Sequence, residues 1–259
     1  NEVYHPDYPY RTGITKELVE YQKTMSDSLI KKYDIKENDL VIDIGSNDGT
    51  LLSGFQKHGI KTIGIEPTNI SQIANKNNIE TIQEFFTTDV AKKIKNTKSE
   101  ASLILATNMF AHMATIGEVI SGIELLLKPD GVFVFENHYL LDVIQGGQFD
   151  TIYHEHLRTY SLKSLITLFS YYNLTITDVE RGTRYGGNIR VHVTKGKDRP
   201  TSKNVESLLK LEEESGLYKL ETYTKFADRV KQAKNDFMNF IFKIKSEDKT
   251  IVGNSCPGR

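Results

Sequence analysis

Two acidic residues flank a glycine turn near the start of the chain, in the sequence V-I-D-I-G-S-N-D-G-T of residues 41–50. The apolar residues before the turn are typical of a central parallel strand, and Gly45 and Gly49 allow the backbone to bend tightly beneath a ligand. Asp43 and Asp48 would repel a pyrophosphate, but they suit a ligand that carries an ammonium and a sulfonium group. The turn therefore favours S-adenosylmethionine over a dinucleotide as the bound cofactor.

A dinucleotide turn would have the pattern G-x-G-x-x-G, which seats a pyrophosphate on the N-terminus of the following helix. Here the middle glycine is replaced by Asn47. Glu66 follows a second apolar run, residues 62–65, and lies about 20 residues beyond the turn, where an acid accepts hydrogen bonds from both ribose hydroxyls in either class of cofactor. The two acids of the turn have a structural alternative, because Asp often caps a helix or closes a turn.

A second group of reactive side chains lies at residues 149–157, F-D-T-I-Y-H-E-H-L, the segment richest in titratable residues. A histidine such as His156 takes and releases protons near neutral pH, and Tyr153 could stabilise an enolate oxygen. Two alternatives stay open. His154 and His156 would share a face if they lay on a strand, and could then bind a metal, or these residues are hydrogen-bonded core residues. Because the chain lacks an H-E-x-x-H pattern, we expect no metal.

A third candidate region surrounds the glycine pair 186–187, with Arg184 before it and Arg190 after it. Two glycines allow a ligand to approach closely or a hairpin to bend, and guanidinium groups pair well with a diphosphate. The structural alternative is a bulge in an edge strand with both arginines in solvent.

Short apolar strands alternate with amphipathic helices, which predicts an α/β fold with a seven-stranded, mostly parallel sheet and helices on both faces. The predicted strands are residues 40–44, 62–65, 81–83, 102–106, 132–136, 175–179 and 188–193, with a turn at 128–131. A helix capped by Thr15 precedes them, and further helices are expected at 204–211 and from 218 to about 245. We expect an N-terminal cap (1–35), a cofactor-binding core (36–196), a helical extension (197–249) and the start of a truncated domain (250–259).

Ligands of open α/β sheets bind at the carboxyl ends of the strands, so the residues that follow each strand are candidates for the site. The candidate cofactor-binding residues are Asp43, Gly45, Ser46, Asn47, Asp48, Gly49, Glu66, Pro67, Asn108 and His112. The candidate substrate-binding residues are Tyr8, Tyr10, Asn137, His138, Arg184 and Arg190.

The composition excludes several classes of partner. The chain has 259 residues, with 33 basic and 34 acidic side chains and a formal charge of -1, so no overall field attracts nucleic acid or anionic lipid. No apolar run reaches the roughly 18 residues of a membrane span, and the N-terminus lacks the apolar core of a signal peptide. The single Cys256 excludes an internal disulfide. We therefore expect a cytoplasmic protein that acts on a small molecule.

Four motifs together resemble the sugar C-methyltransferases of deoxysugar pathways. They are the glycine turn at 41–52, E-N-H-Y-L-L-D-V at 136–143, F-D-T-I-Y-H-E-H at 149–156 and G-G-N-I-R-V at 186–191. The resemblance implies a class I methyltransferase core, S-adenosylmethionine as cofactor, and methylation of a carbon beside the ketone of a nucleotide-linked 4-keto sugar. In that family a Tyr-x-Glu-His element carries the catalysis, which falls here on Tyr153, Glu155 and His156.

The resemblance also implies roles for single residues. His156 would remove the acidic hydrogen beside the ketone while Tyr153 stabilises the oxygen, and Glu155 would orient His156 or hold a sugar hydroxyl. Tyr8 and Tyr10 would close over the sugar. Complete members resemble three-part proteins with a cysteine-rich zinc module in front and a Rossmann-like half behind, so this chain is expected to be a fragment. His138 stands where many relatives are expected to have a proline-like turn residue.

Three other functions fit parts of the sequence. The same cofactor could serve methylation of an oxygen or a nitrogen, with His156 as the base on a hydroxyl. A module that binds S-adenosylmethionine without turnover is the second alternative. An NAD-dependent oxidoreductase is the third, and Asp48 argues against it.

Overall fold

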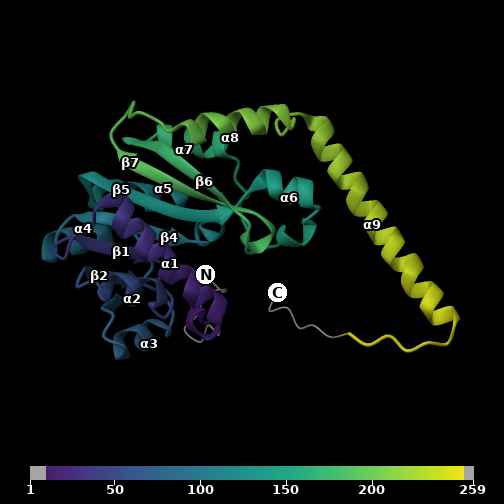
Figure 1. The fold of residues 1–259 in the computed structure, drawn as a ribbon, viewed down its shortest axis with the longest axis horizontal. Helices are drawn as coiled ribbons and strands as arrows, with labels where there is room; N and C mark the ends of the chain where they lie inside the picture. The colour runs from purple at the N-terminus through teal and green to yellow at the C-terminus, as the bar shows by residue number, and fades with distance from the viewer. Residues whose placement is uncertain (1–9, 254–259) are drawn as a thin grey trace.

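Seven strands form one mixed sheet in the computed structural model, which describes residues 10–253 (Figure 1). The strand order is β3-β2-β1-β4-β5-β7-β6, in which neighbouring strands pair in parallel from β3 to β5, while β7 is antiparallel to both β5 and β6. The strands are β1 (Leu40–Ile44), β2 (Lys61–Ile65), β3 (Thr81–Ile82), β4 (Ala101–Thr107), β5 (Leu127–His138), β6 (Leu174–Gly182) and β7 (Asn188–Lys195). The mostly parallel α/β sheet expected from the sequence is confirmed.

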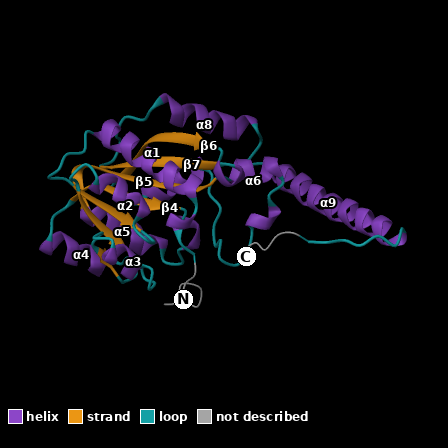
Figure 2. Cartoon of the chain, turned by 60° about the horizontal axis from the view of Figure 1, so that its bottom comes forward, coloured by secondary structure: helices purple, strands orange, loops and turns teal. Residues whose placement is uncertain are grey.

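Helices cover both faces of the sheet (Figure 2). They are α1 (Lys16–Tyr33), α2 (Thr50–Gln56), α3 (Ser71–Lys76), α4 (Thr88–Thr97), α5 (Ile116–Leu126), α6 (Leu140–Gly146), α7 (Leu162–Ser170), α8 (Lys203–Glu214) and α9 (Leu220–Ser246). Four short 3-10 helices join them: η1 (Thr12–Ile14), η2 (Phe110–His112), η3 (Phe149–Thr151) and η4 (Arg184–Gly186).

The two faces are separated by the alternation of side chains along each strand. On β1, Val41 packs in a cluster with apolar residues of α1, α2 and α3. Its neighbours Ile42 and Ile44 belong to the second cluster, which contains apolar residues of α4, α5 and α7. Both faces of β1 are therefore buried, as the continuous apolar run of this strand predicted.

Two local expectations need correction. Residues 128–131 lie within the span of β5 rather than in a separate turn before it, and the register against β4 shifts between Ala101 and Leu103, so these residues bulge from the ladder. The side chain of Thr15 makes no capping hydrogen bond to α1, although its carbonyl oxygen accepts from the amides of Leu18 and Val19, each at 3.0 Å. The helix begins where expected, but without the predicted side-chain cap.

The C-terminal helix α9 extends away from the sheet in both views (Figures 1 and 2). It contacts α6, where the guanidinium of Arg229 donates to the carbonyl oxygens of Ile144 and Gln145, and none of its residues is buried. Among the described helices, none combines the length and the apolar character that a membrane span needs.

Candidate functional site

The glycine turn joins β1 to α2, and its backbone conformation explains why it contains glycine and asparagine. Gly45, Asn47 and Gly49 all have positive φ, at 76°, 51° and 78°, which glycine and asparagine tolerate better than other residues. A Cβ atom on Gly49 would lie 2.8 Å from Cδ1 of Ile79, so no other side chain fits there. The amide of Gly45 donates to the carbonyl oxygen of Ile65 at 2.8 Å, which fixes the turn against the end of β2.

Buried polar atoms without a protein partner gather at this turn. Asp43 is 2% exposed and Ser46 is 4% exposed, and neither Oδ1 of Asp43 nor Oγ of Ser46 has a hydrogen-bond partner among the described residues. An unsatisfied buried oxygen costs about 1–3 kcal/mol, so a ligand that donates to these atoms would gain from the contact. The turn thus has the chemistry to receive a ligand with cationic or hydroxyl donors.

Asp43 should make the stability of the fold depend on pH. Burial, followed by the nearby charge of Glu66, raises the pKa of Asp43 from 3.8 to about 8. The folded chain therefore keeps a proton that the unfolded chain releases above about pH 4, and this contribution to stability is lost as the pH rises toward 8. We expect the free energy of unfolding of the wild type, relative to that of Asp43→Asn, to fall by about 2 kcal/mol between pH 6 and pH 8. Urea unfolding at both pH values measures it, and parallel curves for the two proteins would contradict it.

Glu66 lies at the end of β2 and organises the backbone around it. Its Oε2 accepts from the amide of Asn47 at 3.0 Å, and its Oε1 accepts from the amide of Thr68 at 3.0 Å and the hydroxyl of Thr68 at 2.7 Å. Pro67, which lies between Glu66 and Thr68 in the chain, is half-buried. The carboxylate is thus held rigidly at the carboxyl edge of the sheet, 6% exposed, beside the glycine turn.

The side chain of Asp48 accepts hydrogen bonds from other residues of the protein. Its Oδ1 accepts from the hydroxyl of Thr50 at 2.6 Å and from the amide of Thr50 at 3.3 Å, while its Oδ2 accepts from the amide of Gly13 at 2.9 Å. These contacts match the structural alternative, in which the acid closes the turn. They also attach the N-terminal segment to it.

The ends of β4 and β5 add two asparagines with buried side-chain atoms to the same edge. Asn108 has a φ of 55°, and its amide donates to the carbonyl oxygen of Glu136 at 2.9 Å. The side-chain oxygen of Asn108 and both amide atoms of Asn137, which is 1% exposed, have no partner among the described residues. Since β1, β2, β4 and β5 are parallel, these atoms lie at the same sheet edge as the glycine turn.

Three histidines and a tyrosine meet at the end of this edge. The ring of His156 lies 4.8 Å from that of His112, which ends η2, and 5.2 Å from that of His138, the last residue of β5. The ring of Tyr153 is 4.4 Å from that of His156. Burial, followed by the neighbouring charge of His156, lowers the pKa of His112, which favours its neutral form. The structure therefore brings His112 against the candidate catalytic residue.

The hydrogen bonds of His156 define its tautomer. Its Nδ1 lies 2.7 Å from the carbonyl oxygen of Thr151, which can only accept, so Nδ1 carries the proton. Nε2 is then the acceptor and lies 3.2 Å from the hydroxyl of Tyr153. A backbone carbonyl thus orients the ring of His156 in this structure, and Oε1 of Glu155 lies 3.9 Å from Nε2 of His154. Sequence reasoning missed Thr151 because a backbone contact leaves no signature in residue type.

A family model described as a methyltransferase domain matches residues 19–179, which include the glycine turn and the histidine cluster. The chain belongs to this methyltransferase family. A second model, described as the C-methyltransferase C-terminal domain, matches residues 183–259. The chain is 31% identical over 252 residues to the C-methyltransferase NovU of Streptomyces niveus, and the match covers 96% of this chain but 60% of that protein. The resemblance to C-methyltransferases is confirmed.

Solved structures show the same fold at low sequence identity. The PH0226 protein from Pyrococcus horikoshii matches with a TM-score of 0.57 and 15% identity, covering 75% of this chain and 99% of its own. The plantazolicin methyltransferase BpumL, solved in complex with SAH, matches with a TM-score of 0.54 and 13% identity, covering 70% and 86% of the two chains. The class I methyltransferase fold is thereby confirmed.

The two arginines near the glycine pair have different surroundings in this methyltransferase. The guanidinium of Arg190 donates to Glu136 at 2.8 Å, to Glu180 at 3.2 Å and to the hydroxyl of Tyr21 at 3.1 Å. Burial opposes its charge, but Glu136, Tyr21 and Glu180 together outweigh burial and raise the pKa of Arg190. Because its donors are used inside the protein beneath α1, the geometry does not support a diphosphate contact for Arg190.

Arg184 lies instead on the aromatic rim of the site. Its guanidinium is 4.3 Å from the ring centre of Tyr21 and 5.4 Å from that of Tyr185, and its Nε has no hydrogen-bond partner among the described residues. The ring of Tyr185 in turn lies 5.8 Å from that of His138.

Strand β7 follows the glycine pair and lies between β5 and β6, so the alternative of a bulge in an edge strand is wrong. The glycine pair gives room to Asp142 and Gln148, which approach its backbone closely.

The cap contributes residues that sequence reasoning assigned differently. Tyr8 lies outside the described residues. Tyr10 is 48% exposed, and burial together with the neighbouring Tyr185 raises its pKa. Sequence reasoning missed Tyr21 of α1, whose hydroxyl donates to Glu136 at 2.5 Å, and burial followed by this carboxylate raises the pKa of Tyr21 to about 12.

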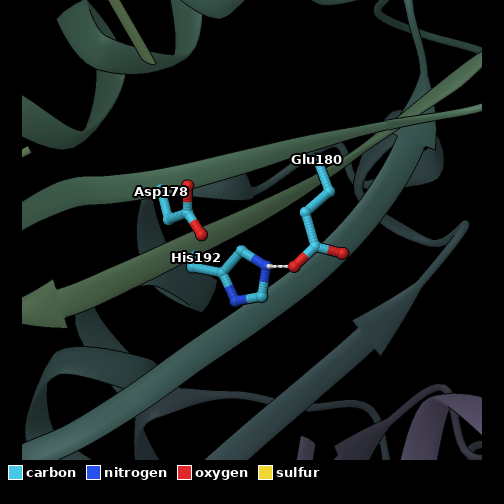
Figure 3. Close-up of side chains that lie close together, drawn as sticks. All are labelled: Asp178, Glu180 and His192. Carbon is cyan, nitrogen blue, oxygen red and sulfur yellow. Dashed lines mark hydrogen bonds and ion pairs between the residues drawn. The ribbon is translucent and has the colours of Figure 1, made fainter. Parts of the chain in front are cut away.

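The histidine pair 154 and 156 does not form a metal site. The segment is a loop, and the side chain of His154 is 79% exposed, so the two rings do not share a face. A different group could hold a metal by geometry: Asp178 and Glu180 of β6 and His192 of β7 (Figure 3). However, the ammonium of Lys32 lies 2.7 Å from both carboxylates, where a metal would have to bind.

Lys32 therefore acts as the cation of this cluster and attaches α1 to the sheet. Burial opposes its charge, but the hydrogen bonds that Lys32 donates to Asp178 and Glu180, together with the charges of these acids, outweigh burial and raise the pKa of Lys32. Its side chain is 32% exposed, so solvent screens part of the interaction. We expect Lys32→Met to lower the free energy of unfolding by about 1–2 kcal/mol, because two carboxylates lose their counter-charge. Urea unfolding measures it against Lys31→Met, an exposed neighbour; equal stabilities of the two variants would refute the assignment.

Proposed function

We propose that this chain is the S-adenosylmethionine-dependent catalytic part of a C-methyltransferase that methylates the carbon beside the ketone of a nucleotide-linked keto sugar. One observation carries the proposal: His156, with its proton held on Nδ1 by Thr151, presents Nε2 next to the hydroxyl of Tyr153. This base and donor pair lies at the carboxyl edge of the sheet that also carries the glycine turn. The relationship to NovU supports the reaction class.

The residues of the glycine turn fit the cofactor. Asp43 and Ser46 have buried oxygens without a partner, which suits the donors of an amino-acid-bearing nucleoside. Glu66 is placed to accept from ribose hydroxyls, and Asn108 adds a further buried acceptor. When bound, S-adenosylmethionine supplies a methyl group on a positively charged sulfur, which leaves as a neutral thioether.

His156 and Tyr153 then divide the proton chemistry on the substrate. Nε2 of His156 accepts the hydrogen beside the ketone, and the electron pair of the broken C–H bond delocalises onto the ketone oxygen. The hydroxyl of Tyr153 donates to that oxygen and stabilises its negative charge. When bound, S-adenosylmethionine would supply the methyl group to the carbon of this enolate, and the electron pair of the C–S bond would remain on its sulfur. Positioning supplies much of the rate, because the methyl group is already activated.

A nucleoside diphosphate would fit the positive charge that Arg184 brings to the aromatic rim of the site. Arg184 stacks on Tyr21, and no carboxylate among residues 10–253 forms an ion pair with its guanidinium. A planar guanidinium pairs well with a diphosphate. Asn137, with both buried amide atoms unsatisfied, and His138 supply further polar contacts for the sugar.

Deuterium placed on the carbon beside the ketone tests the proposal. The protein is incubated with S-adenosylmethionine and a nucleoside-diphosphate-linked 4-keto sugar carrying this label, and S-adenosylhomocysteine and deuterium are followed by mass spectrometry. We expect one deuterium to be lost for each methyl group transferred. Methyl transfer with the deuterium retained would show methylation of oxygen or nitrogen instead. Binding of the cofactor product without any turnover would favour a silent binding module.

We also infer the division of the described chain into cap, core and helical extension, and a cytoplasmic location with a small molecule as partner. The formal charge of -1 supports a partner other than nucleic acid. Cell fractionation tests the location.

A further inference from the structure

The segment of residues 10–13 is attached to the glycine turn by side chains of the turn itself. The side-chain oxygen of Asn47 accepts from the amide of Thr12 at 2.8 Å, and its side-chain nitrogen donates to the carbonyl oxygen of Tyr10 at 3.0 Å. Oδ2 of Asp48 accepts from the amide of Gly13 at 2.9 Å. Thr12 is 6% exposed, so the segment is packed and not only hydrogen-bonded. Both ends of the Asn47 amide are therefore used to hold this segment.

Asn47 is also fixed from the opposite side. Its backbone amide donates to Oε2 of Glu66 at 3.0 Å, and its φ is 51°. A ligand hydroxyl that donates to Glu66 would share this carboxylate with the amide of Asn47. A change at Glu66 is thus transmitted through one residue to the backbone of Tyr10 and Thr12.

Tyr10 brings the segment to the substrate side of the site. Burial, followed by the neighbouring Tyr185 of η4, raises the pKa of Tyr10, which indicates that its hydroxyl lies near this rim. Tyr185 contacts His138 through their rings, which lie 5.8 Å apart. The segment therefore connects the glycine turn with the rim where the sugar nucleotide is proposed to bind.

We propose that Asn47 is a positioning residue that, together with Asp48, latches residues 10–13 over the glycine turn and couples occupation of that turn to the placement of Tyr10 at the substrate rim. The coupling rests on the proposed function, because it requires a ligand that contacts Glu66. The latch itself does not, since its hydrogen bonds join protein groups only.

Gly13 offers a way to open the latch without altering the turn. A Cβ atom at Gly13 would lie 2.7 Å from Oδ2 of Asp48 and 3.0 Å from Oγ1 of Thr50, so Gly13→Ala forces the segment away. Gly253→Ala is the matched control, because nothing lies within 4 Å of its added Cβ atom. Asn47→Gly removes both side-chain hydrogen bonds and keeps a residue that tolerates positive φ.

Trypsin cleavage after Arg11 reports the position of the segment. Without ligand, we expect Gly13→Ala and Asn47→Gly to be cut about tenfold faster than the wild type and Gly253→Ala, the factor that corresponds to about 1.4 kcal/mol of lost hydrogen bonding. Equal rates for all four proteins would refute the latch. This arm uses no cofactor, so it can succeed when the proposed function fails.

The coupling is tested with S-adenosylhomocysteine. We expect it to slow cleavage after Arg11 in the wild type but not in Asn47→Gly, and Asn47→Gly to raise the KM for the keto sugar about tenfold while kcat changes less than twofold. A merely structural role would instead lower kcat in parallel with thermal stability. Wild-type protein that binds S-adenosylhomocysteine, as shown by calorimetry, without any protection at Arg11 would overturn the coupling; absence of binding would overturn it together with the proposed function.

Discussion

Replacement of His156 by alanine is expected to lower kcat by about 100- to 10,000-fold while the affinity for S-adenosylhomocysteine stays within about twofold of the wild type. The factor is that of a general base, which contributes only when the proton is transferred. The ring of His156 meets Tyr153, His112 and His138, and none of the contacts described for it involves the glycine turn. Turnover is measured as S-adenosylhomocysteine released from a nucleoside-diphosphate-linked 4-keto sugar, and affinity by calorimetry.

A second histidine in the same loop, His154, provides the control. His154 is two residues earlier and its side chain is 79% exposed, so His154→Ala should keep kcat within about twofold of the wild type. Tyr153→Phe removes the hydroxyl that lies 3.2 Å from Nε2 and should also lower kcat. If His156→Ala lost cofactor affinity and turnover to the same extent, the residue would be structural and the base would have to be sought elsewhere.

The strands were the most predictable part of the molecule, because their signal is local. Runs such as residues 40–44 are apolar except for Asp43, and such a run is typical of a strand buried on both faces. The bulge at 128–131 escaped prediction since Pro and Gly signal a turn wherever the chain bends, whether or not the sheet continues on both sides. The missing side-chain cap at Thr15 has a similar cause, because capping depends on a rotamer that residue type does not determine.

The site was predictable only as far as residue chemistry determines position. Asp43 and Glu66 lie where the pattern placed them, because the strand ends set their positions. Asp48 and Arg190 were assigned to ligands by charge, yet some of their observed partners, Gly13 and Tyr21, come from a segment distant in sequence. A charged side chain pairs with whatever the tertiary fold brings near, and the sequence does not say where the cap folds back.

Glu66→Ala is expected to raise the dissociation constant for S-adenosylhomocysteine by about 30- to 150-fold, equivalent to about 2–3 kcal/mol. The carboxylate lies 6% exposed at the end of β2, and it already accepts three hydrogen bonds that hold Asn47 and Thr68. Its loss removes the proposed acceptor for the ribose hydroxyls and loosens the loop on both sides of it. Both effects weaken binding, and isothermal calorimetry measures their sum.

Two further variants separate these contributions. Glu66→Gln keeps the length of the side chain and an acceptor for the amide of Thr68, so a loss close to that of Glu66→Ala would assign the effect to the charged hydrogen bonds to the ligand. Glu84→Ala removes an acid that follows β3 at the same edge but pairs with Lys93, and it should leave the affinity unchanged. A dissociation constant for Glu66→Ala within twofold of the wild type would mean that the ligand binds without this carboxylate. The glycine turn would then have to be occupied in a different orientation, with Asp43 as its main acidic contact.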